Sequence, residues 1–295
     1  MRSREAEFER KLAQTGLRQL PDLLQALPDE TARLARLCYA ASPAGDWLDT
    51  PPEVFFSCAA HARYLRENVS WTRALPEPLF LAYVLHPRVN NEALCDCRPV
   101  FYAALAERLR SLPEEAAILE INRWCAEHVA YQPTDERTRS ALAVLRAGFG
   151  RCGEESMFAV NVLRACGFAA RQVYVPRWAH CDDNHAWVEV RCGGAWHFLG
   201  ACEPEAVLDR GWFNSRCFGE PEPGADLIGR EGDVVYCNET ARYADVRRLT
   251  VRVTDENGMS AAGANVDFCV LNNCEWYPAA TVQTDASGMA ALTCG

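Results

Sequence analysis

The spacing of apolar residues changes at Gly167, and this change limits the folds that the chain can adopt. Before it, apolar residues such as Phe158, Val162 and Leu163 recur every three or four positions, the spacing of an amphipathic helix. After it, apolar and polar residues alternate, as in strands. A glycine readily ends a helix at such a point. The sequence therefore predicts a helix followed directly by a sheet, which is typical of the α+β class.

Three segments after Gly167 have the alternation of strands, and two of them are joined by a tight turn. They read ARQVYV, HAWVEVR and WHFLG. Gly193 and Gly194 separate the last two, which is typical of a two-residue β-hairpin. Counted across this turn, Arg191 pairs with Trp196. We therefore expect an antiparallel sheet packed against the preceding helix.

The chain before Cys152 has helical periodicity. Residues 1–115 alternate amphipathic patterns with breaks marked by proline. A longer helix, PEEAAILEINRWCAEHVAY, opens with Pro113 and two glutamates, which suit a helix N-terminus. A shorter one follows in DERTRSALAVLRAGFG. We expect an N-terminal helical region over residues 1–115 and a core of helix and sheet over residues 116–217.

The last part of the chain has a different pattern. Residues 246–295 contain short alternating segments separated by Asn-Gly and Ser-Gly turns, which predicts a β-sandwich. This is about half of the length that such a sandwich needs, so we expect the module to be truncated. Residues 218–245 join it to the core, and their turn residues and acids indicate a surface connection.

Charge and hydropathy exclude several classes of partner. Thirty basic residues stand against forty acidic ones, a formal net charge of −10, which argues against nucleic acid as a partner. No apolar run reaches the ~18 residues of a membrane span, and the first residues form a charged amphipathic pattern rather than a signal peptide. We expect a cytoplasmic protein, or a secreted or cell-surface one if the start is mis-called.

Cys152 differs from the other cysteines in its position. Fifteen cysteines match no disulfide framework, and we expect most of them to be reduced and buried. Cys152 lies in FGRCGEES, between a glycine turn and the start of a helix. A thiol with a pKa of about 8.5 is mostly unionised at neutral pH, and an exposed helix N-terminus contributes only about 0.3–1 kcal/mol. Since Glu154 and Glu155 compete for that terminus, a nucleophilic Cys152 needs an imidazole.

The alternation of the strand that begins at His185 selects this histidine as the base. Ala186, Val188 and Val190 point to one face, and His185 points to the other, at the end far from the hairpin turn. An imidazole there can face a helix end that carries a thiol. Cys152 and His185 are therefore our candidates for nucleophile and general base.

A carboxylate that orients the imidazole is harder to assign. On the paired strand Gly200 and Cys202 share the face of His185, and neither is an acid. Glu203 follows directly, just before Pro204, where the strand exit can turn it toward His185. We take Glu203 as the orienting acid.

Of three other acids near His185 in the sequence, two remain alternatives. Glu189 lies on the correct face, but four residues along a strand is about 13 Å, too far for a hydrogen bond. Asp182 and Asp183 precede the strand in a loop and stay possible.

Two further groups of residues flank the candidate site. Trp178 and Trp187 are candidates for substrate contact, as walls of a cleft. His180, Cys181 and His185 suggest zinc, but they lack a second paired motif. We therefore expect neither a metal nor another cofactor.

Four ordered motifs resemble the transglutaminase-like superfamily of cysteine hydrolases, in its bacterial and peptide N-glycanase-like branches. They are GRCGEES, LRACGFAARQVYV, NHAWVEV and GGAWHFLGACEPE, within about residues 116–215. The resemblance implies a papain-like core whose catalytic cysteine and histidine fall on Cys152 and His185. The family's aspartate falls on Gly200, so this chain departs from the pattern at the third member.

The resemblance also implies a reaction. A cysteine attacks an amide carbonyl and forms a thioester, which water or an amine resolves. We expect a thiol amidase, peptidase or acyl transferase that acts on a peptide or glycopeptide. Residues 246–295 resemble a carboxypeptidase-regulatory-like or Ig-like β domain. The alternative is a non-catalytic protein that kept the fold, lost the acid and binds a polypeptide or glycan.

Overall fold

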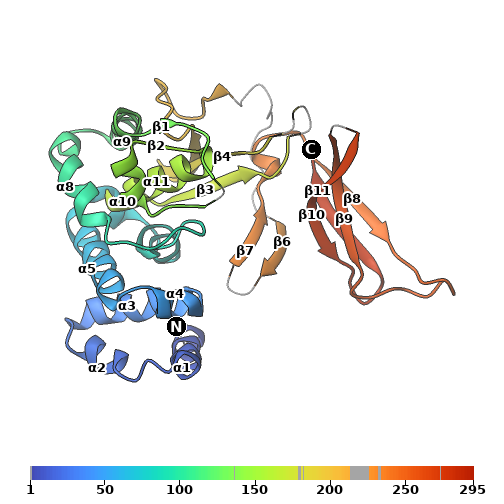
Figure 1. Ribbon diagram of the computed structural model, residues 1–295, viewed down its shortest axis with the longest axis horizontal. Helices are drawn as coiled ribbons and strands as arrows, with labels where there is room; N and C mark the ends of the chain where they lie inside the picture. Colours follow the sequence, from blue (N-terminus) through green and yellow to red (C-terminus); the bar gives the residue numbers. More distant parts are fainter. Residues whose placement is uncertain are drawn as a thin grey trace. The chain divides into compact units, whose positions relative to one another are not determined.

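The computed structural model describes residues 2–135, 137–178, 181, 183–212, 226–231, 234–272 and 274–295 (Figure 1). The chain divides into two compact units. The first comprises Met1–Tyr174 and Ala186–Gly211, and the second comprises Val175–His185 and Trp212–Gly295. Strand β4 begins at the boundary, since its first residue, His185, belongs to the second unit.

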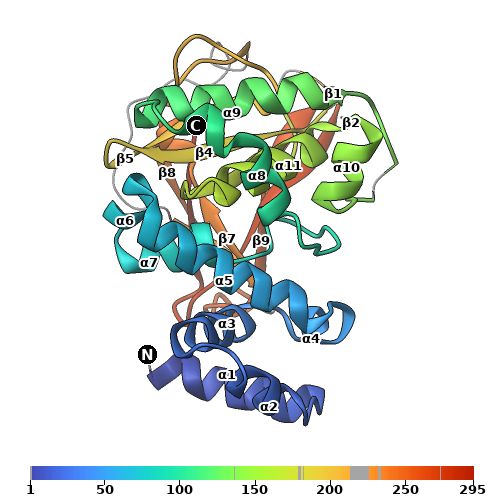
Figure 2. The same ribbon diagram turned by 90° about the vertical axis from the view of Figure 1, so that its left-hand side faces the viewer.

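The first unit begins with short helices, as the periodicity predicts. They are α1 (Arg2–Thr15), α2 (Leu20–Gln25), α3 (Asp29–Ala41), α4 (Ala44–Asp49), α5 (Pro52–Asn68), α6 (Ser70–Ala74), α7 (Glu77–Phe80) and a π-helical turn (Leu81–Leu85). Their apolar faces share one core, in which the Tyr39 ring lies 4.2 Å from Phe55 and 4.8 Å from Trp47 between centroids. Figure 2 shows these helices in sequence from the N-terminus.

A second core forms around α11, which carries Cys152. The elements are α8 (Arg98–Leu109), α9 (Glu114–His128), β1 (Ala130–Tyr131), α10 (Ala141–Ala147), β2 (Phe149–Gly150), α11 (Cys152–Ala165), β3 (Ala170–Val175), β4 (His185–Cys192) and β5 (Ala195–Leu199). Every residue of α11 from Gly153 to Ala165 is buried. The helix is therefore surrounded, with α8, α9 and α10 packed against it.

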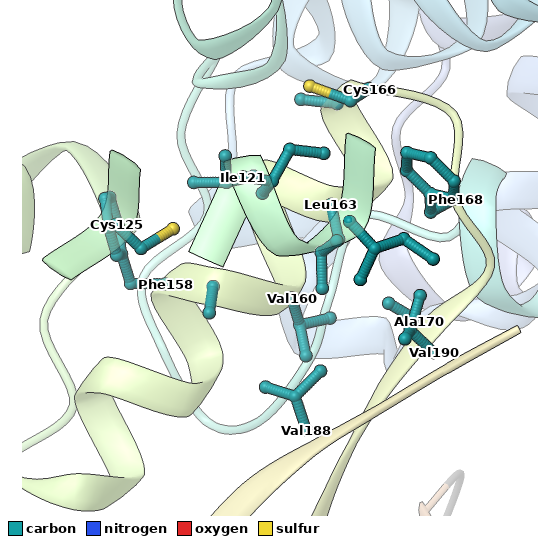
Figure 3. Packing of buried hydrophobic residues seen from close by; sticks show 14 of the residues in the cluster. Ile121, Cys125, Phe158, Val160, Leu163, Cys166, Phe168, Ala170, Val188 and Val190 are labelled. Carbon is teal, nitrogen blue, oxygen red and sulfur yellow. The ribbon is translucent and has the colours of Figure 1, made fainter. Parts of the chain in front are cut away.

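Strands β3, β4 and β5 form the predicted sheet, in that order. The antiparallel pairing of Arg191 with Trp196 is confirmed, and the ladder extends to Val188 opposite Leu199. One face of the sheet packs on α11: Val188 and Val190 share a cluster with helix residues such as Leu163 (Figure 3). The predicted α+β core, with the cysteine helix on an antiparallel sheet, is thus confirmed.

The sequence does not predict the short strands β1 and β2, which hold the loop before Cys152. They pair in parallel, Ala130 with Phe149 and Tyr131 with Gly150. The backbone N–H of Gln132 then donates to the carbonyl of Gly150 at 2.9 Å. A two-residue strand has no periodicity to detect, yet this pairing fixes the backbone that enters α11.

Gly167 ends α11 in the left-handed conformation, as predicted. Its φ is +89°, and Cys166 is the C-cap. The Thr72 hydroxyl donates to the Gly167 carbonyl at 2.8 Å, and a Cβ built on Gly167 would overlap that hydroxyl. A hydrogen bond from α6 therefore holds the end of α11, and Gly167 has no room for a side chain.

Gly167→Ala should lower the free energy of unfolding more than Gly193→Ala. Both glycines have positive φ, which costs alanine about 1–2 kcal/mol, but a Cβ on Gly193 meets nothing within 4 Å. Urea unfolding of the two variants separates crowding against Thr72 from backbone strain. Equal losses of stability would contradict close packing at the end of α11.

The second unit contains the strands β6 (Asp226–Glu231), β7 (Val234–Asn238), β8 (Arg247–Arg252), β9 (Asn265–Asn272), β10 (Glu275–Gln283) and β11 (Met289–Cys294). They pair as β6 with β7, β8 with β11 and β9 with β10, each pair antiparallel. The last four occupy the segment predicted to be β-rich. The hairpin β6–β7, by contrast, lies where the sequence predicts a surface connection, because glycine and charged residues obscure its alternation.

In the described part of the chain, no helix combines the length and the hydropathy of a membrane span. The fourteen cysteines described there are free thiols, but only six of them are buried, so the expectation that most are buried is wrong. The buried ones are Cys38, Cys58, Cys97, Cys125, Cys166 and Cys192.

Candidate active site

Cys152 is the first residue of α11, as the sequence predicts, and it is partly exposed. Its carbonyl accepts a hydrogen bond from the Ser156 hydroxyl at 2.6 Å. The Gln172 side chain on β3 donates to the Ser156 hydroxyl at 2.7 Å and to the Gly153 carbonyl at 3.0 Å. Asn90 in turn donates to the Gln172 side-chain oxygen at 2.6 Å. The first turn of α11 is thus fixed by side chains of the sheet and of the loop before α8.

Glu154 lies at the helix N-terminus as expected, where its Oε2 atom accepts from the Arg151 N–H at 3.4 Å, but its charge is paired. Its buried carboxylate accepts hydrogen bonds from the Arg139 guanidinium at 2.8 and 2.9 Å and from the Thr134 hydroxyl at 3.1 Å. Burial raises the pKa of Glu154, but these hydrogen bonds outweigh it and hold the pKa below its usual value. The charge is compensated by Arg139.

Glu155 is the second acid of the first turn, and it behaves in the opposite way. It is 5% exposed, and burial raises its pKa to about 8, with a further contribution from the nearby carboxylate of Glu203. At neutral pH the Glu155 side chain is therefore mostly protonated. It adds little negative charge beside Cys152, and it places an acid of α11 close to Glu203.

Glu203 occupies the space beside Gly200. A Cβ built on Gly200 would overlap the Oε2 atom of Glu203 and would lie 2.9 Å from its Cβ. The backbone N–H of Glu203 donates to the Gly200 carbonyl at 3.3 Å, so the chain turns back on itself after β5. The carboxylate from position 203 thus lies where a side chain at position 200 would start.

Asn122 of α9 holds this turn. Its side-chain nitrogen donates to the Gly200 carbonyl at 2.9 Å and to the Glu203 carbonyl at 3.2 Å, while its oxygen accepts from the Cys202 N–H at 3.0 Å. Cys202 has a φ of +58°, a conformation that non-glycine residues rarely adopt. A buried amide that satisfies three backbone groups accounts for the tight turn that brings Glu203 back to Gly200.

His185 lies in an aromatic environment. Its ring centroid is 4.6 Å from that of Trp212 and 6.5 Å from that of Trp178. Burial lowers the pKa of His185 to about 4, against an opposing effect of Asp183. The imidazole is therefore neutral at physiological pH, the protonation state of a general base. The sequence singled out Trp178 but not Trp212, which belongs to none of the recognised motifs.

Three other candidate residues, Trp178, Trp187 and Glu189, are buried. Trp187 is 3% exposed and Trp178 is 6% exposed, so only small parts of either ring can meet a substrate. Glu189 is fully buried, and its carboxylate accepts from Arg171 at 2.7 Å, which gives that acid a structural role. His180 and Asp182 lie outside the described residues.

No cluster of three or more histidine, cysteine, aspartate or glutamate side chains suited to a metal ion occurs in the part of the chain that the structure describes.

The segment that forms the helix and the sheet has a counterpart among known protein families. Residues 103–201 match the family model of the transglutaminase-like superfamily. The region that carries the candidate site is therefore similar to a transglutaminase-like core. The match includes Cys152, His185 and Gly200 and ends before Glu203. Gly200, where this chain departs from the expected motif, therefore lies at the end of the matched region.

Comparison with solved structures gives a further similarity. The chain is similar to the crystal structure of a "Putative Cysteine Protease" from Cytophaga hutchinsonii, with 18% sequence identity and a TM-score of 0.35. The similarity covers 49% of this chain and 50% of that one, so the matched region spans half the length of that protein. No curated protein matches the sequence.

Glu155→Gln should change how stability depends on pH. Because the pKa of Glu155 is raised in the folded state, the folded state holds this proton more tightly than the unfolded chain does. This contribution to stability is complete below about pH 4.5 and is lost as the pH rises to about 8. Chemical unfolding at several pH values should therefore show Glu155→Gln gaining stability relative to wild type across that range. A constant difference would contradict a protonated Glu155.

Proposed function

We propose that this protein is a thiol-dependent amide hydrolase or acyl transferase of the transglutaminase-like kind. Cys152 is the nucleophile, His185 is the general base, and Glu203 orients the imidazole. The substrate is the amide of a peptide or glycopeptide. The match of residues 103–201 supports the kind of enzyme, and the position of Glu203 supports the completed triad.

The placement of Glu203 is the observation that carries this proposal. The family's aspartate falls on Gly200, which has no side chain. In this chain the Glu203 carboxylate fills the space beside the Gly200 backbone, within a turn that Asn122 holds. A longer side chain from three residues later thus brings a carboxylate back to the family position. Gly200 is then required, because any side chain there would displace Glu203.

The protonation states fit a general-base mechanism. A neutral His185 accepts the Cys152 thiol proton as the sulfur attacks the amide carbonyl carbon. The C–N bond then breaks, the imidazolium returns the proton to the leaving amine, and a thioester remains. Water or a second amine resolves the thioester. The backbone N–H of Cys152 is our candidate for one donor to the oxyanion.

The nucleophile is tested with a panel of peptide and glycopeptide amides. Wild type should release amine, and Cys152→Ala should abolish release without loss of folding, because no other thiol is placed at the start of α11. Mass spectrometry of wild type after a rapid quench should detect the acyl group on Cys152. Adding a primary amine separates hydrolysis from acyl transfer, since only transfer incorporates the amine. An acyl group on another cysteine would contradict the assignment.

Moving the carboxylate back to the family position tests Glu203. Glu203→Gly should lower kcat about 10²–10⁴-fold, the range over which positioned acid–base groups contribute. The double variant Gly200→Asp/Glu203→Gly should recover a large part of this loss, because glycine at 203 removes every Glu203 atom that blocks a side chain at 200.

The matched control is Gly200→Asp alone. It should be less active and less stable than the double variant, since the introduced side chain would then overlap that of Glu203. Full activity of Glu203→Gly would show that this carboxylate does not orient the base. If wild type and Cys152→Ala bind the same peptides equally and neither releases amine, the chain is the non-catalytic binding protein instead.

A further inference from the structure

Cys95 and Cys97 form a second thiol site, in the loop before α8. The backbone N–H of Cys97 donates to the carbonyl of Cys95 at 2.9 Å, which closes a three-residue turn. An extended chain would separate these Cα atoms by about 7 Å, and the turn brings them closer together. Each thiol also shifts the pKa of the other.

Cys95 is surrounded by hydrogen-bond donors. The Cys97 thiol, the backbone N–H groups of Leu142 and Ala141 and the Ser140 hydroxyl all favour the thiolate form of Cys95. Ser140 also accepts from the Ala143 N–H at 3.3 Å, so its own proton is available for the sulfur. These donors lower the pKa of Cys95 to about 6, although burial opposes them. Cys95 is partly exposed and can therefore meet a small reagent.

Cys97 has the complementary properties. It is 4% exposed, and the neighbouring Cys95 thiol, together with burial, raises its pKa well above the usual value, so it stays a thiol. Its sulfur also lies 3.7 Å from the Oδ1 atom of Asn161 on α11, a second acceptor for the same proton. An exposed thiolate thus stands beside a protected thiol, the arrangement of an attacking and a resolving cysteine.

We propose that Cys95 and Cys97 are a redox-active dithiol, which small hydroperoxides convert to an intramolecular disulfide. In the first step the Cys95 thiolate attacks a peroxide oxygen, the O–O bond breaks, and Cys95 becomes a sulfenic acid while water or an alcohol leaves. In the second step the Cys97 sulfur attacks the Cys95 sulfur and releases water. Two thiols lose two electrons and two protons in all, and the peroxide is reduced.

The buried pair Cys38 and Cys58 is an internal control for access. Here too each thiol shifts the pKa of the other, and Cys38 lowers the pKa of Cys58 to about 7. Both point to the Leu85 carbonyl and both are buried, with Cys38 1% and Cys58 5% exposed. In both pairs one cysteine lowers the pKa of the other. Of these four thiols, only Cys95 is open to a reagent.

The experiment treats the full chain with hydrogen peroxide at neutral pH, blocks remaining thiols and maps peptides without reduction. We expect a Cys95–Cys97 disulfide to form at least about tenfold faster than any modification of Cys38 or Cys58. In Cys97→Ser, which keeps Cys95 but lacks the resolving thiol, dimedone should label Cys95 as a sulfenic acid. In Cys95→Ser the disulfide should be lost and Cys97 should stay reduced.

Three results would overturn the proposal: no oxidation of Cys95 before the buried pair, a Cys95 sulfenic acid in wild type that Cys97 never resolves, or unchanged oxidation of Cys97 in Cys95→Ser. Circular dichroism checks that each variant is folded. The first two results are measured in wild type and need no variant. Because the dithiol does not depend on the proposed enzymatic activity, Cys152→Ala should oxidise at the same rate as wild type.

Discussion

The packing of α11 between the surrounding helices and the β3–β4–β5 sheet is the constraint on which the first unit depends. Its residues from Gly153 to Ala165 are all buried, and each large apolar side chain among them contributes about 1.5–3 kcal/mol. A helix buried on all sides cannot shift without disrupting several elements at once. This rigidity fixes the position of its first residue, Cys152, the one residue of the helix that is not buried.

Two polar arrangements at the start of α11 keep negative charge away from the thiol. Arg139 compensates the charge of Glu154, and burial holds Glu155 in its protonated form. Both acids therefore have structural roles. At the end of β5, Asn122 uses one buried amide to hold the turn that returns Glu203 to Gly200. The Glu203 carboxylate therefore lies beside the backbone of Gly200.

The sequence predicted what depends on periodicity and on turn residues. The helix from Cys152, its end at Gly167 and the hairpin at Gly193 and Gly194 follow from local preferences, and all three are observed. The strands β1 and β2 escaped prediction because two residues carry no period. The pairing of Glu154 with Arg139 and the turn at Glu203 escaped it because both depend on contacts between distant segments. Counting the strand register showed that Gly200 stands where an acid is expected. It could not show that the Glu203 side chain lies beside this position.

The most direct test of the account is the hydrogen bond proposed between Glu203 and the His185 ring. In protein labelled with ¹⁵N-histidine, NMR near neutral pH should detect a neutral His185 with a downfield, exchange-protected ring N–H. Glu203→Gln should shift this N–H signal upfield and leave the other histidines unchanged, because an amide oxygen is a weaker acceptor than a carboxylate. A His185 signal that is the same in both proteins would contradict the role assigned to Glu203.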